Sequence, residues 1–186
     1  MHAGPRNSHI WIFWNRPISV IYVDGSDQYI TTRVTSNSNV IFIMFFYGSC
    51  DSHKREEFWG DLGVFSPGTI PWVVVGDFNT VVTVQERRGR GPFPRRESER
   101  FAHFMAVNGL LDHGFSGDPF TWCNNRRGNS RSWSRLDRCL ANDQAISLFS
   151  SLKVTHLVHG ISDHSPLLVT LSYRQDREDQ FHFSHL

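Results

Sequence analysis

Residues 71–79 read Pro-Trp-Val-Val-Val-Gly-Asp-Phe-Asn, and this stretch decides how the rest of the chain is interpreted. The β-branched run Val73–Val75 is too short for a helix and predicts a buried strand that the following glycine ends. If the extended backbone continues through Phe78, the side chains of Asp77 and Asn79 point the same way. A carboxylate and an amide at a strand end are typical of α/β active sites, although Asn79 also fits a simple capped turn.

Composition and charge favour one globular domain with an anionic partner. The chain has 186 residues, enough for a single hydrophobic core. Arginine supplies 17 of the 19 basic residues, and eleven arginines against five acids fall between residues 87 and 138. The planar guanidinium suits phosphate, although the alternative is a solvated basic loop. The candidate nucleic-acid-binding residues are Arg87, Arg88, Arg90, Arg126, Arg127 and Arg131.

Cysteine usage and hydropathy indicate an intracellular chain, in nucleus or cytoplasm. Cys50, Cys123 and Cys139 are widely spaced and form no CxxC pair, so neither a zinc site nor a disulfide framework is expected. The longest apolar run, residues 40–47, is too short to cross a bilayer, so we expect no membrane association. The N-terminus has no apolar segment of the kind found in signal peptides.

The hydrophobic pattern predicts strands with helices interleaved only in places, which favours an α/β sandwich with a mixed sheet. Strands are expected at residues 10–14, 18–23, 28–34, 40–47, 71–76, 120–122, 132–140, 153–159 and 167–173. Helices are expected at residues 51–62, 97–108 and 142–149. The segment 86–96 has no hydrophobic period and is expected to be an exposed loop, and the tail from residue 174 is expected to be frayed.

Several side chains that can carry chemistry lie near the ends of these strands. His164 beside Asp163 offers a cation or general acid next to a hard oxygen ligand. A further carboxylate, Asp137, can hold the imidazole in one tautomer. Tyr47 ends the apolar strand 40–47, where its hydroxyl can face a cleft or simply pack.

In their order along the chain, these segments resemble the endonuclease/exonuclease/phosphatase family, which has the fold of abasic-site endonucleases and DNase I. They look most like the endonuclease domain of plant LINE-type (non-LTR) retrotransposons. The residues that carry the resemblance are Tyr47-Gly48, Pro71-Trp72, Gly76-Asp77-Phe78-Asn79, Phe120-Thr121-Trp122, Arg135-Leu136-Asp137-Arg138 and Ser162-Asp163-His164-Ser165-Pro166. The resemblance implies a DNase I-like, four-layer α/β sandwich of two packed mixed β-sheets flanked by helices. This domain would span residues 1–173, and residues 174–186 would be a polar tail.

The resemblance also implies cleavage of a phosphodiester and gives each site residue a role. Asp77 would activate or position the attacking water, and Asn79 would hold the phosphate oxygens. His164, oriented by Asp137, would contact the scissile phosphate and stabilise its developing charge. Tyr47 would donate a hydrogen bond to a phosphate oxygen. The arginine-rich loops would follow the backbone of DNA or RNA.

The resemblance implies Mg²⁺ or Mn²⁺ as cofactor, with Asp163 contributing to the metal site. Family members carry an Asn on a first strand and, further on, a Glu that is a main metal ligand, and neither is visible here. The first glutamate of the chain is Glu56, in an expected helix. We therefore expect an N-terminally truncated, partial domain that holds metal weakly, has impaired activity, and self-associates through an exposed sheet edge.

Two other functions fit the same residues. The chain can be a non-catalytic remnant that binds nucleic acid through its arginine loops. It can also be a phosphatase for a small-molecule or lipid phosphate, an activity found in the same superfamily. The arginine-rich loops and the Phe120-Thr121-Trp122 stretch favour nucleic acid over such a phosphate.

Overall fold

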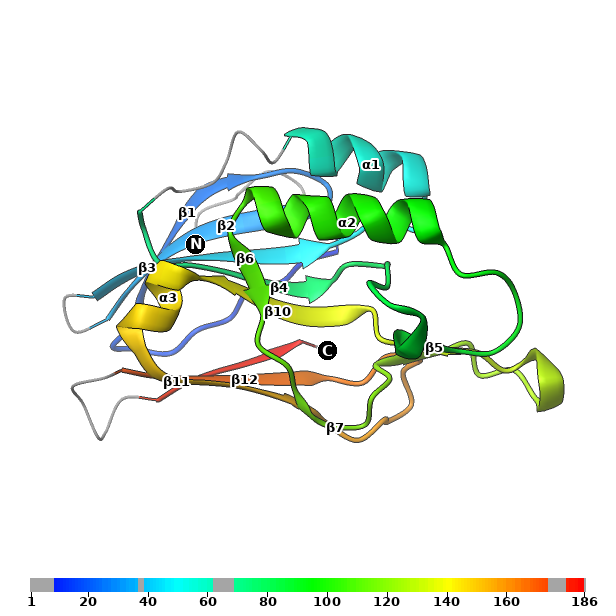
Figure 1. Ribbon diagram of the computed structural model, residues 1–186. Helices are drawn as coiled ribbons and strands as arrows, with labels where there is room; N and C mark the ends of the chain where they lie inside the picture. Colours follow the sequence, from blue (N-terminus) through cyan, green and yellow to red (C-terminus); the bar gives the residue numbers. More distant parts are fainter. Residues whose placement is uncertain (1–8, 37–38, 62–68, 174–179, 186) are drawn as a thin grey trace.

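A mixed six-stranded sheet forms the centre of the molecule, in a computed structural model that describes residues 9–36, 39–61, 69–173 and 180–185 (Figure 1). In spatial order its strands are β1 (Ser19–Gly25), β2 (Tyr29–Ser36), β3 (Asn39–Tyr47), β4 (Trp72–Asp77), β10 (Asp137–Asn142) and β6 (Leu110–Asp112). Among the described strands of this sheet, only β3 and β4 pair in parallel, which sets Tyr47 beside Asp77. Because β10 pairs antiparallel with β4, Asp137 lies opposite Asp77 at the same end of the sheet.

Two smaller sheets complete the β structure. The four-stranded sheet contains, in spatial order, β13 (Gln180–His185), β12 (Leu167–Tyr173), β11 (Phe149–His156) and β7 (Ser116–Gly117). The three-stranded sheet contains β5 (Arg87–Arg88), β9 (Trp133–Ser134) and β8 (Trp122–Cys123). An isolated bridge joins Trp122 to His164, so the small sheet reaches the loop that follows β11.

The helices and one-turn segments connect these sheets. The α-helices are α1 (Ser52–Asp61), α2 (Arg95–Val107) and α3 (Asp143–Leu148), and the 3-10 turns are η2 (Val84–Glu86) and η3 (Gly128–Ser130). The Asn142 side chain caps α3 by accepting a hydrogen bond from the amide of Ala145, as its sequence position predicts. Gly109 follows α2 with φ of 60°, the left-handed conformation expected after a helix.

The strands β4 and β10 in the middle of the central sheet are buried on both faces. Figure 1 shows α1 and α2 over one face, while β11 and β12 lie across the other. On the helix side, Trp72 and Val74 of β4 pack with Phe101 and Phe104 of α2. On the opposite side the core between the two sheets contains Val73, Val75, Val154, Leu167, Val169 and Leu171. This double burial explains why residues 72–75 form an unbroken apolar run.

The structure confirms the predicted mixed α/β fold with packed β-sheets. Several element predictions were wrong. Residues 10–14 form no strand, and Trp11 and Phe13 are 78% and 85% exposed. The predicted strand 132–140 is two strands, β9 and β10, because the chain passes from the small sheet to the central sheet at Arg135–Leu136. The tail expected to be frayed contains β13, which pairs antiparallel with β12. No described helix is long and apolar enough to cross a membrane.

Candidate active site

The end of β4 forms a tight turn that brings an amide onto a carboxylate. Gly76 has φ of 144°, and a Cβ there would lie 1.9 Å from the carbonyl oxygen of Phe46, so only glycine fits. Asn79 has φ of 50°, so the extended backbone does not continue to it, and its amide donates to Asp77 Oδ1 at 2.8 Å. The capped turn therefore forms, with Asp77 as the acceptor. The Asn79 side chain still returns to the site, because Nδ2 donates to Asp77 Oδ2 at 3.2 Å and to the carbonyl of Gly48 at 3.0 Å.

A line of three side chains runs from β10 to β4. His164 Nδ1 lies 2.9 Å from Asp137 Oδ2, and His164 Nε2 lies 3.9 Å from Asp77 Oδ2. Because Asp137 is fully buried and acts as an acceptor, it fixes the imidazole with Nδ1 protonated and Nε2 directed toward Asp77. Residues 60 and 27 positions apart in the chain thus meet at one point, as the sequence predicted.

The protonation state of His164 follows from this arrangement. Burial acts to lower its pKa, but the hydrogen bond and charge of Asp137, with the charges of Asp77 and Asp163, raise the pKa to about 9. The ring is therefore an imidazolium at neutral pH. A cation held by a buried carboxylate is suited to binding an anionic phosphate oxygen and to acting as a general acid.

Asp163 and Tyr47 lie at the edge of this arrangement. The exposed Asp163 accepts a hydrogen bond at Oδ2 from the indole Nε1 of Trp122, at 3.1 Å. Burial raises the pKa of the Tyr47 phenol, and the charges of Cys50, Asp77 and Asp163 raise it further. The phenol is therefore a donor at neutral pH. The ring of His9 stacks on Tyr47, with centroids 4.9 Å apart.

The carboxylates of this site offer oxygen ligands of the kind that a divalent cation takes. Ligand atoms of Asp77, Asp137 and His164 all lie within 4.8 Å of one another. The two carboxylates and the imidazolium of this group give it a formal net charge of about −1, and carboxylate oxygens are hard ligands. Asp163, the residue predicted to bind metal, is not part of this close group, and its carboxylate lies beside it on the exposed side.

A family comparison relates the chain to known proteins. Residues 4–164 match the Endonuclease/Exonuclease/phosphatase family. The chain belongs to this family. No curated protein sequence matches it.

Solved structures of the same family share the fold at low sequence identity. The endonuclease domain of TRAS1, a telomere-specific non-LTR retrotransposon, superposes with a TM-score of 0.65 at 17% identity, over 88% of this chain and 72% of that one. The Xenopus laevis APE2 catalytic domain superposes with a TM-score of 0.59 at 16% identity, over 78% of this chain and 55% of that one. The 3' phosphatase NExo from Neisseria, bound to product DNA hairpin, superposes with a TM-score of 0.56 at 18% identity. The match covers 85% of this chain and 70% of that one. The chain thus spans between about half and three quarters of these family members.

The six candidate arginines of this family member differ in their surroundings. Arg87 is engaged inside its own loop, where its guanidinium donates to the carbonyls of Arg90 and Pro92. Arg88 and Arg131 lie over the ring of Trp133, at 5.2 and 5.4 Å from its centroid. Arg90, Arg126 and Arg127 are exposed. The structure therefore places these arginines at the surface but gives them unequal freedom to bind a ligand.

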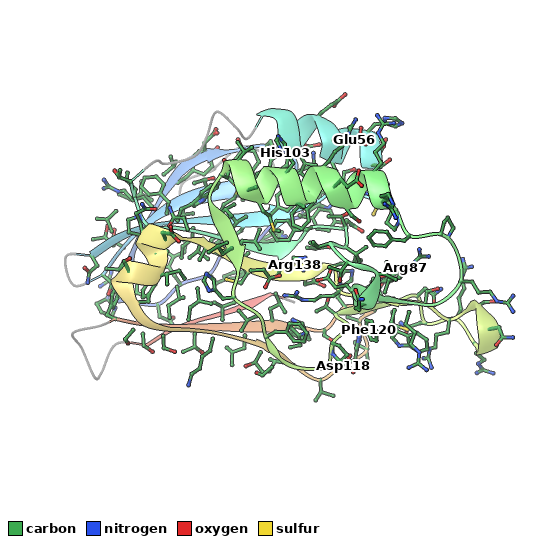
Figure 2. The ribbon with its side chains drawn as sticks, in the orientation of Figure 1. Glu56, Arg87, His103, Asp118, Phe120 and Arg138 are labelled. Carbon is green, nitrogen blue, oxygen red and sulfur yellow. The ribbon has the colours of Figure 1, made fainter. Side chains whose placement is uncertain are left out.

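The segment predicted to be an exposed loop from residue 86 begins with a buried ion-pair network, so that prediction was wrong at its start. Glu86 pairs with Arg135 and Arg138, at 3.1 and 2.6 Å, and Asp112 pairs with both arginines at 2.9 and 3.0 Å. Figure 2 shows Arg138 in the interior of the fold, and its side chain has no exposed surface. No local sequence signal reveals the network, because its acids and bases lie on η2, on β6, on β10 and in the link between β9 and β10.

Thr121 is a second residue whose role the sequence did not reveal. Its Oγ1 accepts hydrogen bonds from the amides of Leu136 and Asp137, at 2.9 and 3.0 Å. Its carbonyl accepts from the amide of Ser165 at 2.7 Å, next to His164. One buried threonine thus links the two segments that supply the Asp137–His164 pair. In the sequence, Thr121 stands out only as part of the Phe120-Thr121-Trp122 stretch. That stretch marks Thr121 as a residue of interest but does not indicate that its hydroxyl accepts two backbone hydrogen bonds.

Proposed function

We propose that the chain is a retrotransposon-derived endonuclease domain that hydrolyses phosphodiester bonds of nucleic acid with a divalent metal, Mg²⁺ or Mn²⁺. The observation that carries the proposal is the line formed by Asp137, His164 and Asp77, with gaps of 2.9 and 3.9 Å. Family membership supports phosphodiester chemistry, and the similarity to the TRAS1 endonuclease domain supports nucleic acid as the substrate class.

Each side chain of the site has a separate role in the proposed hydrolysis. Asp77 accepts a proton from, or orients, the attacking water, and Asn79 fixes this carboxylate through two hydrogen bonds. The imidazolium of His164 binds a non-bridging phosphate oxygen, and its charge becomes more valuable as negative charge develops there. Tyr47 donates a hydrogen bond to a second oxygen.

The metal would be held by carboxylates of the same site. Asp77 and Asp163 are the acids best placed for this, because Asp137 is engaged with His164. A bound divalent cation would supply neutralisation of phosphate charge and a more acidic water. We propose weak metal binding and slow turnover, because internal partners already occupy part of each carboxylate: Asn79 on Asp77 and Trp122 on Asp163.

A plasmid-nicking assay tests the proposal. Supercoiled DNA is incubated with the protein in Mg²⁺, in Mn²⁺ and in excess chelator, next to the Asp77→Ala/His164→Ala double variant. We expect slow, metal-dependent conversion to the nicked circle that the double variant loses. Nicking that survives in the double variant comes from contamination and contradicts the proposal.

A second candidate function is nucleic-acid binding without catalysis. The exposed arginines Arg88 and Arg131, which have no carboxylate within ion-pair distance among the described residues, favour it. Salt-dependent DNA binding without nicking in any metal would support this function. Turnover of a phosphomonoester in preference to DNA would instead support a phosphatase.

A further inference from the structure

Two arginines from different segments share one indole ring beside the candidate active site. Arg88 on β5 and Trp133 on β9 are directly opposite one another in an antiparallel pair. The guanidinium carbon of Arg88 lies 5.2 Å from the ring centroid, and that of Arg131 lies 5.4 Å from it. Both arginines are exposed and Trp133 is half-buried. We call these three residues the Arg88–Trp133–Arg131 cluster.

A guanidinium held over an indole keeps its hydrogen-bond donors for an anion. The cation–π attraction acts on the charge of the group and does not use up its N–H donors. No described carboxylate forms an ion pair with Arg88 or Arg131, in contrast to Arg135 and Arg138. Arg87, next to Arg88 in sequence, has its donors directed to carbonyls of its own loop. The cluster is therefore a pair of positive charges held in place without an internal partner.

The backbone around the cluster is fixed by its own hydrogen bonds. Asn124 Oδ1 accepts from the amides of Arg126 and Ser132, and its Nδ2 donates to the carbonyl of Ser130. A Cβ at Gly89 would lie 2.5 Å from Ser132 Oγ, so the loop carrying Arg88 packs closely on the hairpin carrying Arg131. Less side-chain and loop freedom is lost when such a surface binds a ligand.

The cluster is also connected to the catalytic side chains. Trp133 pairs with Cys123 across β8 and β9, and the amide of Cys123 donates to the carbonyl of Asp163 at 2.9 Å. Trp122, on the same strand, forms a bridge with His164. Figure 1 shows the hairpin with η3 (yellow-green) extending beyond the sheets on the side where β5 lies. The cluster therefore lies on the small sheet that borders the His164 loop, and a nucleic acid extending from a phosphate at His164 would pass along this sheet.

From this geometry we infer that Trp133 is a positioning residue that holds Arg88 and Arg131 as a clamp for phosphates flanking the one bound at His164. The inference rests on the proposed action on nucleic acid. It goes further by singling out two of the exposed arginines and by giving an aromatic residue the task of orienting them.

Binding of a fluorescein-labelled DNA duplex, measured by fluorescence anisotropy across a salt series without divalent metal, tests the inference. The variants are Trp133→Leu, Trp133→Tyr, Arg88→Gln/Arg131→Gln and the triple variant. Arg33→Gln, an exposed arginine on β2 in the central sheet, is the charge-matched control. Circular dichroism and thermal unfolding establish that each variant folds.

We expect Trp133→Leu to weaken binding about tenfold, because two side chains lose their preorganisation, and Trp133→Tyr to restore most of it. Arg88→Gln/Arg131→Gln should lower the salt slope by about 2. Adding Trp133→Leu to this double variant should lower the DNA affinity little further, since the ring then has no arginine to orient. Arg33→Gln should resemble the parent protein.

Independent, additive losses from Trp133→Leu and the arginine pair would overturn the inference, as would equal binding by the Leu and parent proteins. In both cases salt-dependent binding by the parent chain would leave the proposed function standing. Should Trp133→Leu fail to fold, the other two variants still test the inference. Trp133→Tyr must then bind DNA nearly as well as the parent protein, and Arg88→Gln/Arg131→Gln must bind it weakly. Absence of any DNA binding by the parent protein would overturn both the inference and the proposed function.

Discussion

At the scale of single residues, the Asp137–His164 pair links the chemistry of the site to folding. The pKa of His164 is raised to about 9 in the folded protein, against an ordinary value of 6.5. Its contribution to stability is therefore fully present below pH 6.5 and is lost as pH rises through 9. Since the ring is partly exposed, we expect this contribution to be about 2 kcal/mol.

Urea unfolding at a series of pH values measures this contribution. The parent protein should lose more free energy of unfolding between pH 6.5 and 9 than His164→Gln does. The two curves should converge at the alkaline end. Parallel curves across this range would show that Asp137 does not stabilise the imidazolium.

Thr121 gives a second prediction at this scale. Thr121→Val keeps the shape of the side chain but removes the acceptor for the buried amides of Leu136 and Asp137. We expect a loss of roughly 2–4 kcal/mol in the free energy of unfolding, because two donors lose their partner. Thr121→Ser should restore most of it. An equal loss in the Ser and Val proteins would show that the methyl group matters and the hydroxyl does not.

The sequence predicted which residues meet in the site better than how they meet. Asp77, Asn79, Asp137 and His164 were found because each follows an apolar strand or lies near the end of one, and strand ends gather at one edge. The left-handed backbone at Asn79 was not predicted, because a Gly-Asp-Phe-Asn sequence is compatible with both an extended strand end and a turn. The role of Thr121 depends on contacts with residues 15 and 16 positions away, which no local pattern encodes.

At the scale of elements, the network of Glu86, Asp112, Arg135 and Arg138 joins η2, β6 and β10. Burial acts to raise the pKa of Glu86, but the hydrogen bond and charge of Arg138 outweigh burial and lower it. Glu86→Gln should cost about 3 kcal/mol, because the fully buried Arg138 loses a main counter-charge.

Chemical denaturation checks this value, with Glu57→Gln as the control. Glu57 is exposed on α1, and its substitution should change stability by less than about 0.5 kcal/mol. A cost for Glu86→Gln as small as that of the control would mean that the network contributes little to folding.

Elements were predicted well where periodicity is strong and poorly where the chain changes sheets. Residues 167–173 have apolar or aromatic side chains at every second position, alternate in burial and form β12 as expected. Residues 10–14 have the composition of a strand, but composition does not supply a neighbouring strand, and in the described structure this segment has no strand geometry. The basic stretch 87–138 looks uniform in sequence, whereas Arg96, Arg100, Arg135 and Arg138 are in ion pairs.

At the scale of the whole molecule, the strand β1 is an apolar edge of the central sheet within the described residues. Ile21 and Val23 are 47% and 41% exposed there. We expect association at high protein concentration through this edge, and Ile21→Lys/Val23→Lys should reduce it. Sedimentation velocity over a range of concentrations measures the effect. Identical sedimentation of both proteins would exclude this edge as the contact.

The exposed hairpin between β8 and β9 is a point at which the chain can be divided into two fragments. Arg126 and Arg127 are exposed on it, so trypsin is expected to cut there before it reaches the covered strands. The cut leaves Asp77 on one piece and both Asp137 and His164 on the other, joined by the ladder of β4 and β10. Two separately produced halves, split at this hairpin, would then assemble the phosphate site only when mixed, which makes the domain a natural scaffold for a complementation switch.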